Sequence, residues 1–158
     1  MKVLMLFLLT IIAFVYVSAE TIQLKSVAEV MDALKKGEKV RMVVYYAKCQ
    51  LISGNEIEDS SPDAIGGMDV GTFEYFAPNS VRNPKGFLAF SENSLIEHRS
   101  YGYVINYVKV RVYDDNKVQI TAQYLKTDTH EAVMDESFYS MVNDGKNDKA
   151  AVYFYKTK

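Results

Sequence analysis

Two consecutive segments of the chain alternate between apolar and polar side chains, and this pattern constrains the fold more than any other feature. Between Tyr101 and Tyr113 four valines share one face, while aromatic and basic side chains occupy the other. The alternation resumes from Lys117 to Tyr124, after a short turn at residues 114–116. Such a pattern is typical of an antiparallel hairpin with one buried face.

The remaining sequence predicts one helix and several further strands. Ser26 and Glu29 form a capping box, and apolar residues follow at helical spacing until Gly37. Strands are predicted at residues 40–46, 68–76, 87–91, 131–141 and 150–155, with loops at 51–67 and 77–86. We therefore expect an α+β fold in which one N-terminal amphipathic helix packs on a largely antiparallel, curled β-sheet of about six or seven strands.

The first 19 residues have the order of features found in secretory signal peptides. Lys2 precedes an apolar stretch from Val3 to Val17, and Val17 and Ala19 occupy the −3 and −1 positions of a cleavage site. The apolar stretch is shorter than the roughly 20 residues that span a bilayer, which disfavours the alternative of an uncleaved anchor. We expect cleavage after Ala19, a single mature domain at residues 20–158, a secreted location and no membrane insertion after cleavage.

The mature chain would have 139 residues, 17 basic and 20 acidic side chains, and no Asn-x-Ser/Thr sequon. This size fits one domain with a substantial core. The mild acidity gives no reason to expect nucleic acid as a partner. Cys49 is the only cysteine, so no internal disulfide is possible. We expect a buried, inert thiol; a disulfide between chains and a catalytic thiol are the alternatives.

Several short motifs resemble the VirK family of small exported proteins. They are Ala33–Gly37, the strand that runs into Cys49, Ile65-Gly66-Gly67, Leu88–Ser91 and the Tyr-Val-x-x-Tyr-Val hairpin. The resemblance covers about residues 26–124 and implies an exported single domain, with Cys49, Gly66 and Gly67 as signature positions. It implies no reaction, because the family defines no catalytic residue.

The sequence contains no recognisable catalytic, cofactor or metal motif. His98 and His130 have no histidine partner at metal-binding spacing, so we interpret both as surface residues. Residues 143–148 are rich in oxygen ligands but do not have EF-hand spacing, and we interpret them as a solvated turn. The adjacent Gly66 and Gly67 lack the Lys-Ser/Thr of a phosphate loop and indicate positive φ angles or a β-bulge.

The outward face of the hairpin is the best candidate for recognition. It presents Tyr103, Tyr107, Lys109, Arg111 and Tyr113, a set suited to stacking against a sugar, an aromatic ligand or a protein. The competing interpretation, which the pattern alone favours, is that the helix or another layer covers these side chains.

Three functional hypotheses follow. The first is a non-enzymatic extracellular protein that binds a protein, glycan or small ligand through the sheet face or the 51–67 loop. The second is a carrier that holds an apolar ligand within the curled sheet, which needs a cavity of about 300 Å³ or more. The third is a secreted hydrolase, which needs a histidine or a carboxylate pair in a cleft.

Overall fold

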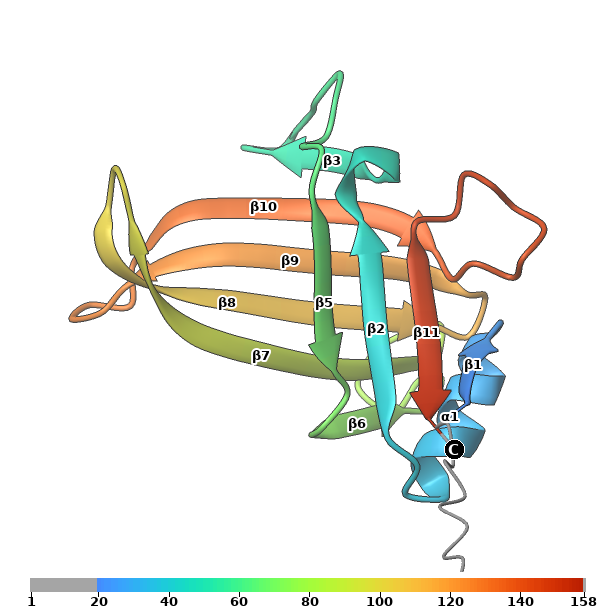
Figure 1. The fold of residues 1–158 in the computed structure, drawn as a ribbon. Helices are drawn as coiled ribbons and strands as arrows, with labels where there is room; N and C mark the ends of the chain where they lie inside the picture. The colour runs from blue at the N-terminus through green and yellow to red at the C-terminus, as the bar shows by residue number, and fades with distance from the viewer. Residues whose placement is uncertain (1–19, 158) are drawn as a thin grey trace, which may run out of the picture.

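Residues 20–157 form two antiparallel β-sheets stacked face to face in the computed structural model, with one helix at their end (Figure 1). The first sheet has four strands, in the order β1 (Thr21–Leu24), β11 (Val152–Thr157), β2 (Val40–Tyr45) and β5 (Ile65–Asp69). The second has seven, in the order β4 (Glu56–Ile57), β3 (Gln50–Ser53), β10 (Ala132–Met141), β9 (Lys117–Lys126), β8 (Gly102–Tyr113), β7 (Phe87–His98) and β6 (Phe73–Phe76). The predicted signal peptide, residues 1–19, lies outside the described residues.

The expectation of a single curled sheet with six or seven strands is wrong, because the strands divide between two sheets that are not curled. The predicted strand at 68–76 is broken at residues 70–72, where the chain leaves the first sheet as β5 and enters the second as β6. The predicted loop at 51–67 contains β4 and parts of β3 and β5. These short strands lack the long alternation by which strands are recognised in a sequence.

The predicted strand at 87–91 extends as β7 to His98, although residues 91–95 are exposed and mostly polar. Its partner explains the length: β7 and β8 are in continuous register from Phe87↔Tyr113 to His98↔Gly102. The hairpin of β8 and β9 is confirmed, with Val104, Val110 and Val112 buried on one face.

The helix α1 (Val27–Lys35) is also confirmed. The Ser26 hydroxyl accepts a hydrogen bond from the Glu29 N–H at 3.3 Å, and the Glu29 carboxylate accepts one from the Lys25 N–H at 2.8 Å. Its buried residues are Val27, Val30, Met31, Ala33 and Leu34, and they belong to the same apolar cluster as both sheets. Within residues 20–157 no helix is both long and apolar enough to cross a bilayer.

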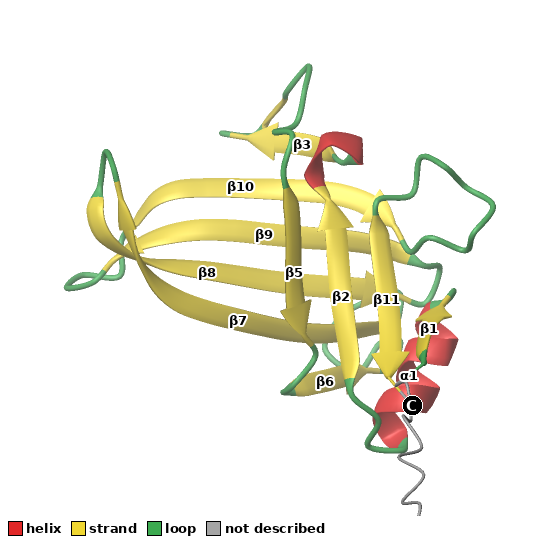
Figure 2. Ribbon diagram, viewed as in Figure 1, coloured by secondary structure: helices red, strands yellow, loops and turns green. Residues whose placement is uncertain are grey.

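The main core lies between the two sheets, at the end of the molecule where α1 packs. Its largest fully buried side chains include Phe154 and Met42 from the first sheet and Leu88 and Ile120 from the second. The strands of the first sheet run crosswise over those of the second (Figure 2), an arrangement known from other two-sheet proteins. Because the strands cross, the short first sheet covers only part of the long second sheet.

Candidate ligand-binding cleft

A cleft opens where the first sheet stops covering the second. β5 is the edge strand of the first sheet, and β7–β10 continue beyond it (Figure 1). The space between the sheets at this edge has a volume of about 500 Å³. Eighteen residues line it: Met42, Val44, Tyr46, Pro62, Ala64, Gly66, Gly67, Met68, Glu92, Asn93, Ser94, Asn106, Val108, Ala122, Tyr124, Met134, Glu136 and Phe138.

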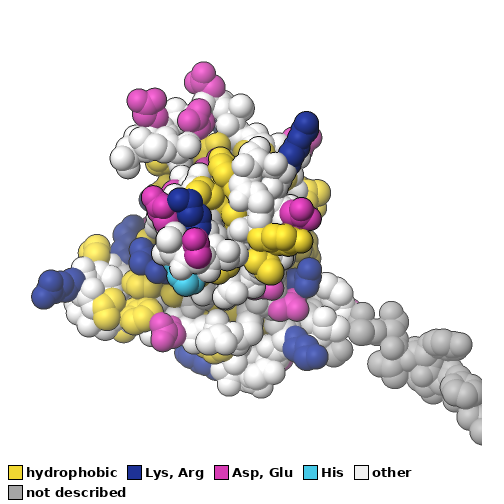
Figure 3. Space-filling model, turned by 90° about the vertical axis from the view of Figure 1, so that its left-hand side faces the viewer, with side chains coloured by type: hydrophobic (Ala, Val, Ile, Leu, Met, Phe, Trp, Pro, Cys, Tyr) yellow, Lys and Arg dark blue, Asp and Glu magenta, His cyan; other side chains and the backbone are white. Residues whose placement is uncertain are grey.

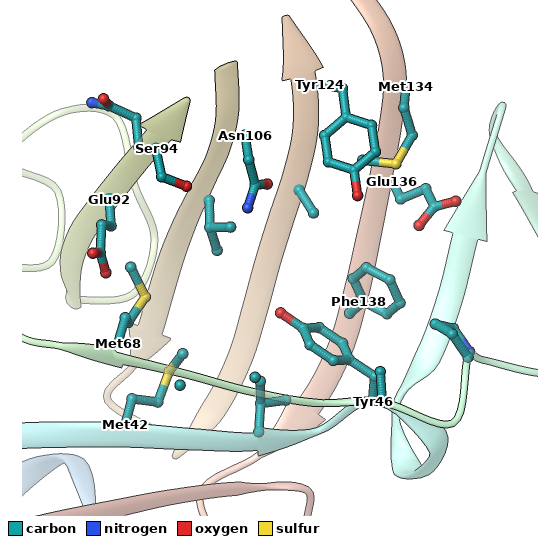
Figure 4. Close-up of a pocket in the computed structure, with 18 residues that line it drawn as sticks. Met42, Tyr46, Met68, Glu92, Ser94, Asn106, Tyr124, Met134, Glu136 and Phe138 are labelled. Carbon is teal, nitrogen blue, oxygen red and sulfur yellow. The ribbon is translucent and has the colours of Figure 1, made fainter. Parts of the chain in front are cut away.

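The floor of the cleft changes from apolar to polar along the strands of the second sheet. The first row across the sheet, Phe90, Val110, Ile120 and Phe138, is buried in the core. The next row is Glu92, Val108, Ala122 and Glu136, and the third is Ser94, Asn106, Tyr124 and Met134. Figure 4 labels six side chains of these two outer rows, which face the same space: Glu92, Glu136, Ser94, Asn106, Tyr124 and Met134. The gradient lets one ligand contact apolar and polar groups together.

The roof comes from β2, β5 and the short 3-10 helix η1 (Tyr46–Lys48). Met42 and Met68 are paired across β2 and β5 and lie over the floor (Figure 4). The Tyr46 ring packs edge-on against Phe138, with 4.7 Å between ring centroids. Methionine side chains adapt readily to different apolar shapes, so this roof suits an apolar ligand.

Gly66 makes room for the Tyr46 ring. A Cβ atom at Gly66 would lie 2.8 Å from Tyr46 Cε2, and one at Gly67 would lie 3.1 Å from the Met42 carbonyl oxygen. Neither glycine has a positive φ angle, and both lie in regular register with β2. The prediction of positive φ or a bulge is therefore wrong; close approach explains Gly66, and Gly67 is also tightly enclosed.

Burial raises the pKa of the Tyr46 hydroxyl, and the nearby Cys49 and Tyr124 raise it further. Tyr46 therefore remains a neutral hydrogen-bond donor at physiological pH. Among the described residues we find no hydrogen-bond partner for the side chains of Ser94, Asn106 and Tyr124, which face the cleft. These groups are available to a ligand.

Cys49 follows η1, and the prediction of a buried thiol is confirmed: the residue is 8% exposed. Its sulfur lies 3.7 Å from the Tyr45 carbonyl oxygen. Burial raises the pKa of the thiol to about 11, against a smaller lowering by a hydrogen bond with Ser140. A thiol with such a pKa is a poor nucleophile at neutral pH, because the thiolate is the reactive form.

The predicted recognition face lies on the opposite side of the second sheet from the cleft. Tyr103 is 62% exposed, while Tyr107, Lys109, Arg111 and Tyr113 are half-buried. The buried residues of the helix belong instead to the core cluster that contains Val110 and Val112, on the other face of the second sheet. The structure thus brings these five side chains onto one outer surface, but not into the cleft.

A shallow hollow of about 230 Å³ lies on this outer surface, between β8 and β9. Lys109 and Arg111 line it together with Tyr107 and three polar residues of β9. The Arg111 guanidinium lies over the Phe87 ring at 5.4 Å, and its Nε atom is buried without a hydrogen-bond partner in the described structure. The Tyr113 hydroxyl donates to Gln119 Oε1 at 3.2 Å.

The two histidines lie near hairpin turns. His98 stacks on Tyr101 at 4.7 Å between ring centroids, and its Nδ1 accepts from the Ser100 N–H. His130 is exposed in the β9–β10 turn. Within residues 20–157 no three metal-ligating side chains come together.

Residues 143–148 differ from the predicted solvated turn in one respect: Asn143 is 5% exposed. Its Nδ2 donates to two carbonyl oxygens of the same loop and to the Tyr153 hydroxyl. Asn143 therefore anchors the loop from inside.

Sequence reasoning missed the cleft and most of its polar lining. Glu92 and Ser94 lie beyond the predicted strand at 87–91, and Glu136 was not distinguished within its strand. One signal was present: Asn106 interrupts the line of valines on the buried face of β8. A polar residue at such a position indicates either a buried hydrogen bond or a water-accessible space.

A model of VirK proteins matches residues 23–130, more than half of the chain. This chain belongs to the VirK family. A crystal structure of a VirK family protein from Legionella pneumophila is similar, with a TM-score of 0.63 and 12% identity over 84% of this chain and 98% of that one. At this identity the likeness shows the VirK fold alone. No curated protein matches the chain.

The matched residues include Cys49, Gly66 and Gly67, the three positions that the sequence resemblance indicates as a signature. In this VirK protein the two glycines line the cleft, and Cys49 contributes to the raised pKa of Tyr46, which also lines it. The VirK family has no characterised function, so the role of the cleft has to be argued from its geometry.

Proposed function

We propose that this VirK protein is a secreted, non-enzymatic carrier that holds a small, largely apolar ligand in the cleft between its two sheets. The main observation in support is the cleft itself, because its volume of about 500 Å³ lies in the range of small-molecule sites. This proposal corresponds to the carrier hypothesis drawn from the sequence. The ligand would lie in a cleft between two sheets, however, and not inside one curled sheet.

The composition of the lining supports a ligand with an apolar body. Met42, Met68, Met134, Val108 and Phe138 supply adaptable apolar surface. Burial of such surface is the main favourable term in binding an apolar molecule. The 51–67 segment also contributes to the walls through Pro62 and Ala64. The segment that the sequence suggests as a binding loop therefore borders the same cavity that the carrier hypothesis requires.

The two carboxylates of the cleft do not form a catalytic pair, so they give no support to glycoside hydrolysis. Glu92 and Glu136 belong to β7 and β10, separated by two intervening strands. With about 4.8 Å between strands, their backbones lie about 14 Å apart. Figure 4 shows the two side chains on opposite sides of the cleft. Glycosidase carboxylates lie about 5–9.5 Å apart.

Titration with a neutral solvatochromic dye, such as Nile red, tests the proposal. We expect the emission to shift to the blue on binding, and Ala122→Phe to weaken binding at least tenfold by filling the floor of the cleft. Thr121→Phe is the matched control, because it adds the same ring to the opposite face of the same strand.

A second obstructing variant, Asn106→Phe, keeps the test valid if Ala122→Phe does not fold. Asn106 lies farther from the core, so a larger side chain there disturbs folding less. Thermal unfolding identifies the folded variants. Equal dye binding by the wild type and both folded, obstructed variants would refute a ligand site in this cleft.

Secretion is tested separately, by N-terminal sequencing of the protein from the medium of cells that express the full chain. We expect a mature chain that begins at Glu20. Retention of the chain in the membrane fraction would support the alternative of an uncleaved anchor.

Partner binding at the outer face is a second candidate function. It is favoured by the exposure of Tyr103 and by the hollow that Tyr107, Lys109 and Arg111 line on the same face. The set suggested by the sequence, Tyr103, Tyr107, Lys109, Arg111 and Tyr113, would then form one contact surface. A glycan array compared between the wild type and Lys109→Ala tests it; no glycan bound by the wild type would count against a glycan partner.

A further inference from the structure

We propose that the ligand of the cleft is a dication: a small diamine with an apolar chain between its two ammonium groups. This inference rests on the proposed function and names the chemical class that the cleft selects. It follows from the charges in the lining, their spacing across the sheet and the acidic segment beside the cleft.

The cleft contains negative charge and no compensating positive charge. Glu92 and Glu136 are the only charged residues among the 18 that line it, all from the described part of the chain. Neither carboxylate has an ion pair or a side-chain hydrogen bond within residues 20–157. Glu92 is exposed, while Glu136 is half-buried, so the charge of Glu136 is only partly solvated. A cationic group would supply the missing partner.

The register of the second sheet places one carboxylate at each end of an apolar trough. Glu92 is opposite Val108, Val108 is opposite Ala122, and Ala122 is opposite Glu136. The four residues therefore cross β7–β10 in one row, on the face that forms the floor of the cleft. The two backbones at the ends of the row are about 14 Å apart. Methylene groups fit the middle of this row and ammonium groups fit its ends.

The chain beside the cleft adds to the negative potential. Residues 50–81 include six acidic side chains and no lysine or arginine. Pro62 and Ala64 of this segment line the cleft. Figure 3 looks onto the end of the molecule where β7–β10 extend beyond the first sheet; acidic side chains gather at its top, over the β3–β4 segment. A cleft bordered by charge of one sign raises the local concentration of oppositely charged ligands.

Two cations near the cleft are already paired with other carboxylates. Lys126, at the end of β9 beyond the cleft, lies 2.7 Å from Glu131, and Arg41 of β2 lies 2.8 Å from Asp69. Neither of them lines the cleft. They therefore leave Glu92 and Glu136 free to bind a ligand cation.

Aromatic groups in the cleft also suit an ammonium ion. Tyr46 and Tyr124 contribute ring faces and hydroxyl oxygens to the lining (Figure 4). Aromatic faces attract cations, and the attraction increases as water is excluded. An anionic ligand would instead face two unpaired carboxylates, which is unfavourable in a partly desolvated space.

The test compares ligands that share a ten-carbon chain but differ at the ends: 1,10-diaminodecane, 1-aminodecane, decane-1,10-diol and decanedioic acid. A chain of roughly this length matches the separation of about 14 Å across four strands. Binding is measured by displacement of Nile red and by calorimetry, at low and high salt. We expect the diamine to bind at least tenfold more tightly than the diol, with an advantage that falls as salt rises.

The variants Glu92→Gln and Glu136→Gln remove the charges with little change of shape. We expect each to weaken diamine binding roughly fivefold or more and to weaken diol binding much less, because a glutamine amide still forms hydrogen bonds with a neutral hydroxyl. Glu97→Gln is the matched control, because Glu97 is on the same strand as Glu92 but on the opposite face. It should bind the diamine like the wild type.

The outcomes separate the two proposals. Equal affinity for the diamine, the diol and the diacid would overturn the inference, while Nile red binding in the cleft would leave the carrier function standing. Equal affinity for the monoamine and the diamine would overturn the two-ended arrangement. If no ligand binds, including Nile red, the proposed function itself fails.

Discussion

Gly66 shows how a single missing side chain shapes the cleft. The Tyr46 ring lies against this glycine and packs on Phe138 from the other sheet. Tyr46 thereby links the roof and the floor near the edge of the core. A side chain at position 66 would displace the ring, and with it one wall of the cleft.

We expect Gly66→Ala to lower the free energy of unfolding by about 1–3 kcal/mol, because its methyl group overlaps Tyr46 Cε2. Gly71→Ala is the control, since a Cβ atom there meets nothing within 4 Å and its φ angle is not positive. Urea unfolding followed by circular dichroism measures both variants. Equal stability of the two would show that the Tyr46 ring moves without cost.

The Cys49 thiol gives a second prediction at the residue scale. Its pKa of about 11 means that little thiolate exists at pH 8. We expect slow labelling of the native protein by a thiol reagent, a rate that rises with pH towards 11, and rapid labelling in guanidinium. Fast labelling of the native protein at pH 8 would contradict the buried, inert thiol.

The same shift fixes the sign of the effect of pH on stability. The folded state keeps the thiol proton, while the unfolded state loses it near pH 9. The contribution of Cys49 to stability is therefore complete below about pH 9 and declines as pH rises to about 11.

Among the elements, the loop between β10 and β11 depends on one buried side chain. Asn143 Nδ2 donates to the carbonyl oxygens of Asn147 and Ala150, and its Oδ1 accepts from the Gly145 N–H at 2.8 Å. The Gln23 side chain of β1 donates to the Asn143 carbonyl oxygen at 3.0 Å. The loop is thus tied to β1, at the far edge of the first sheet.

We expect Asn143→Ala to lower the free energy of unfolding by about 2–4 kcal/mol, because buried carbonyl groups lose their donors. Asp148→Ala, in the same loop but exposed, should change it by less than about 0.5 kcal/mol. Denaturant unfolding compares the two variants. An unchanged free energy of unfolding for Asn143→Ala would mean that water replaces the hydrogen bonds of the side chain.

At the scale of the whole molecule, the chain passes repeatedly between the two sheets. It leaves the first sheet after β2, returns for β5, forms β6–β10 in the second and ends in the first as β11. Neither sheet is a continuous piece of chain. The two sheets share one apolar cluster, so each needs the other to bury its apolar face.

We expect the two sheets to unfold in one cooperative transition. Far-ultraviolet circular dichroism and tyrosine fluorescence should give the same denaturation midpoint. Amide exchange should be faster in β7 at Leu95, which is 65% exposed, than in β8 at Val110, which is fully buried. Two separate transitions would show that one sheet persists without the other.

Local patterns were sufficient to predict the helix from Ser26, the β8–β9 hairpin and the buried Cys49. Each depends on neighbours within a few residues: a cap three positions away, or alternation along one strand. They failed for β3 and β4, which are too short to show a period. They also failed for the polar end of β7, which is a strand only because β8 pairs with it.

By itself, then, the sequence determined that the apolar face of the helix and the valine face of the hairpin are buried, because periodicity records burial directly, but it did not determine whether the opposite, tyrosine face is covered. Only the tertiary structure decided how the strands divide between two sheets and where one sheet stops covering the other. It alone brought Glu92 and Glu136, 44 positions apart, into one row of the same face. The physical reason is that register and crosswise packing arise from contacts between distant segments, and the cleft exists only where those contacts end.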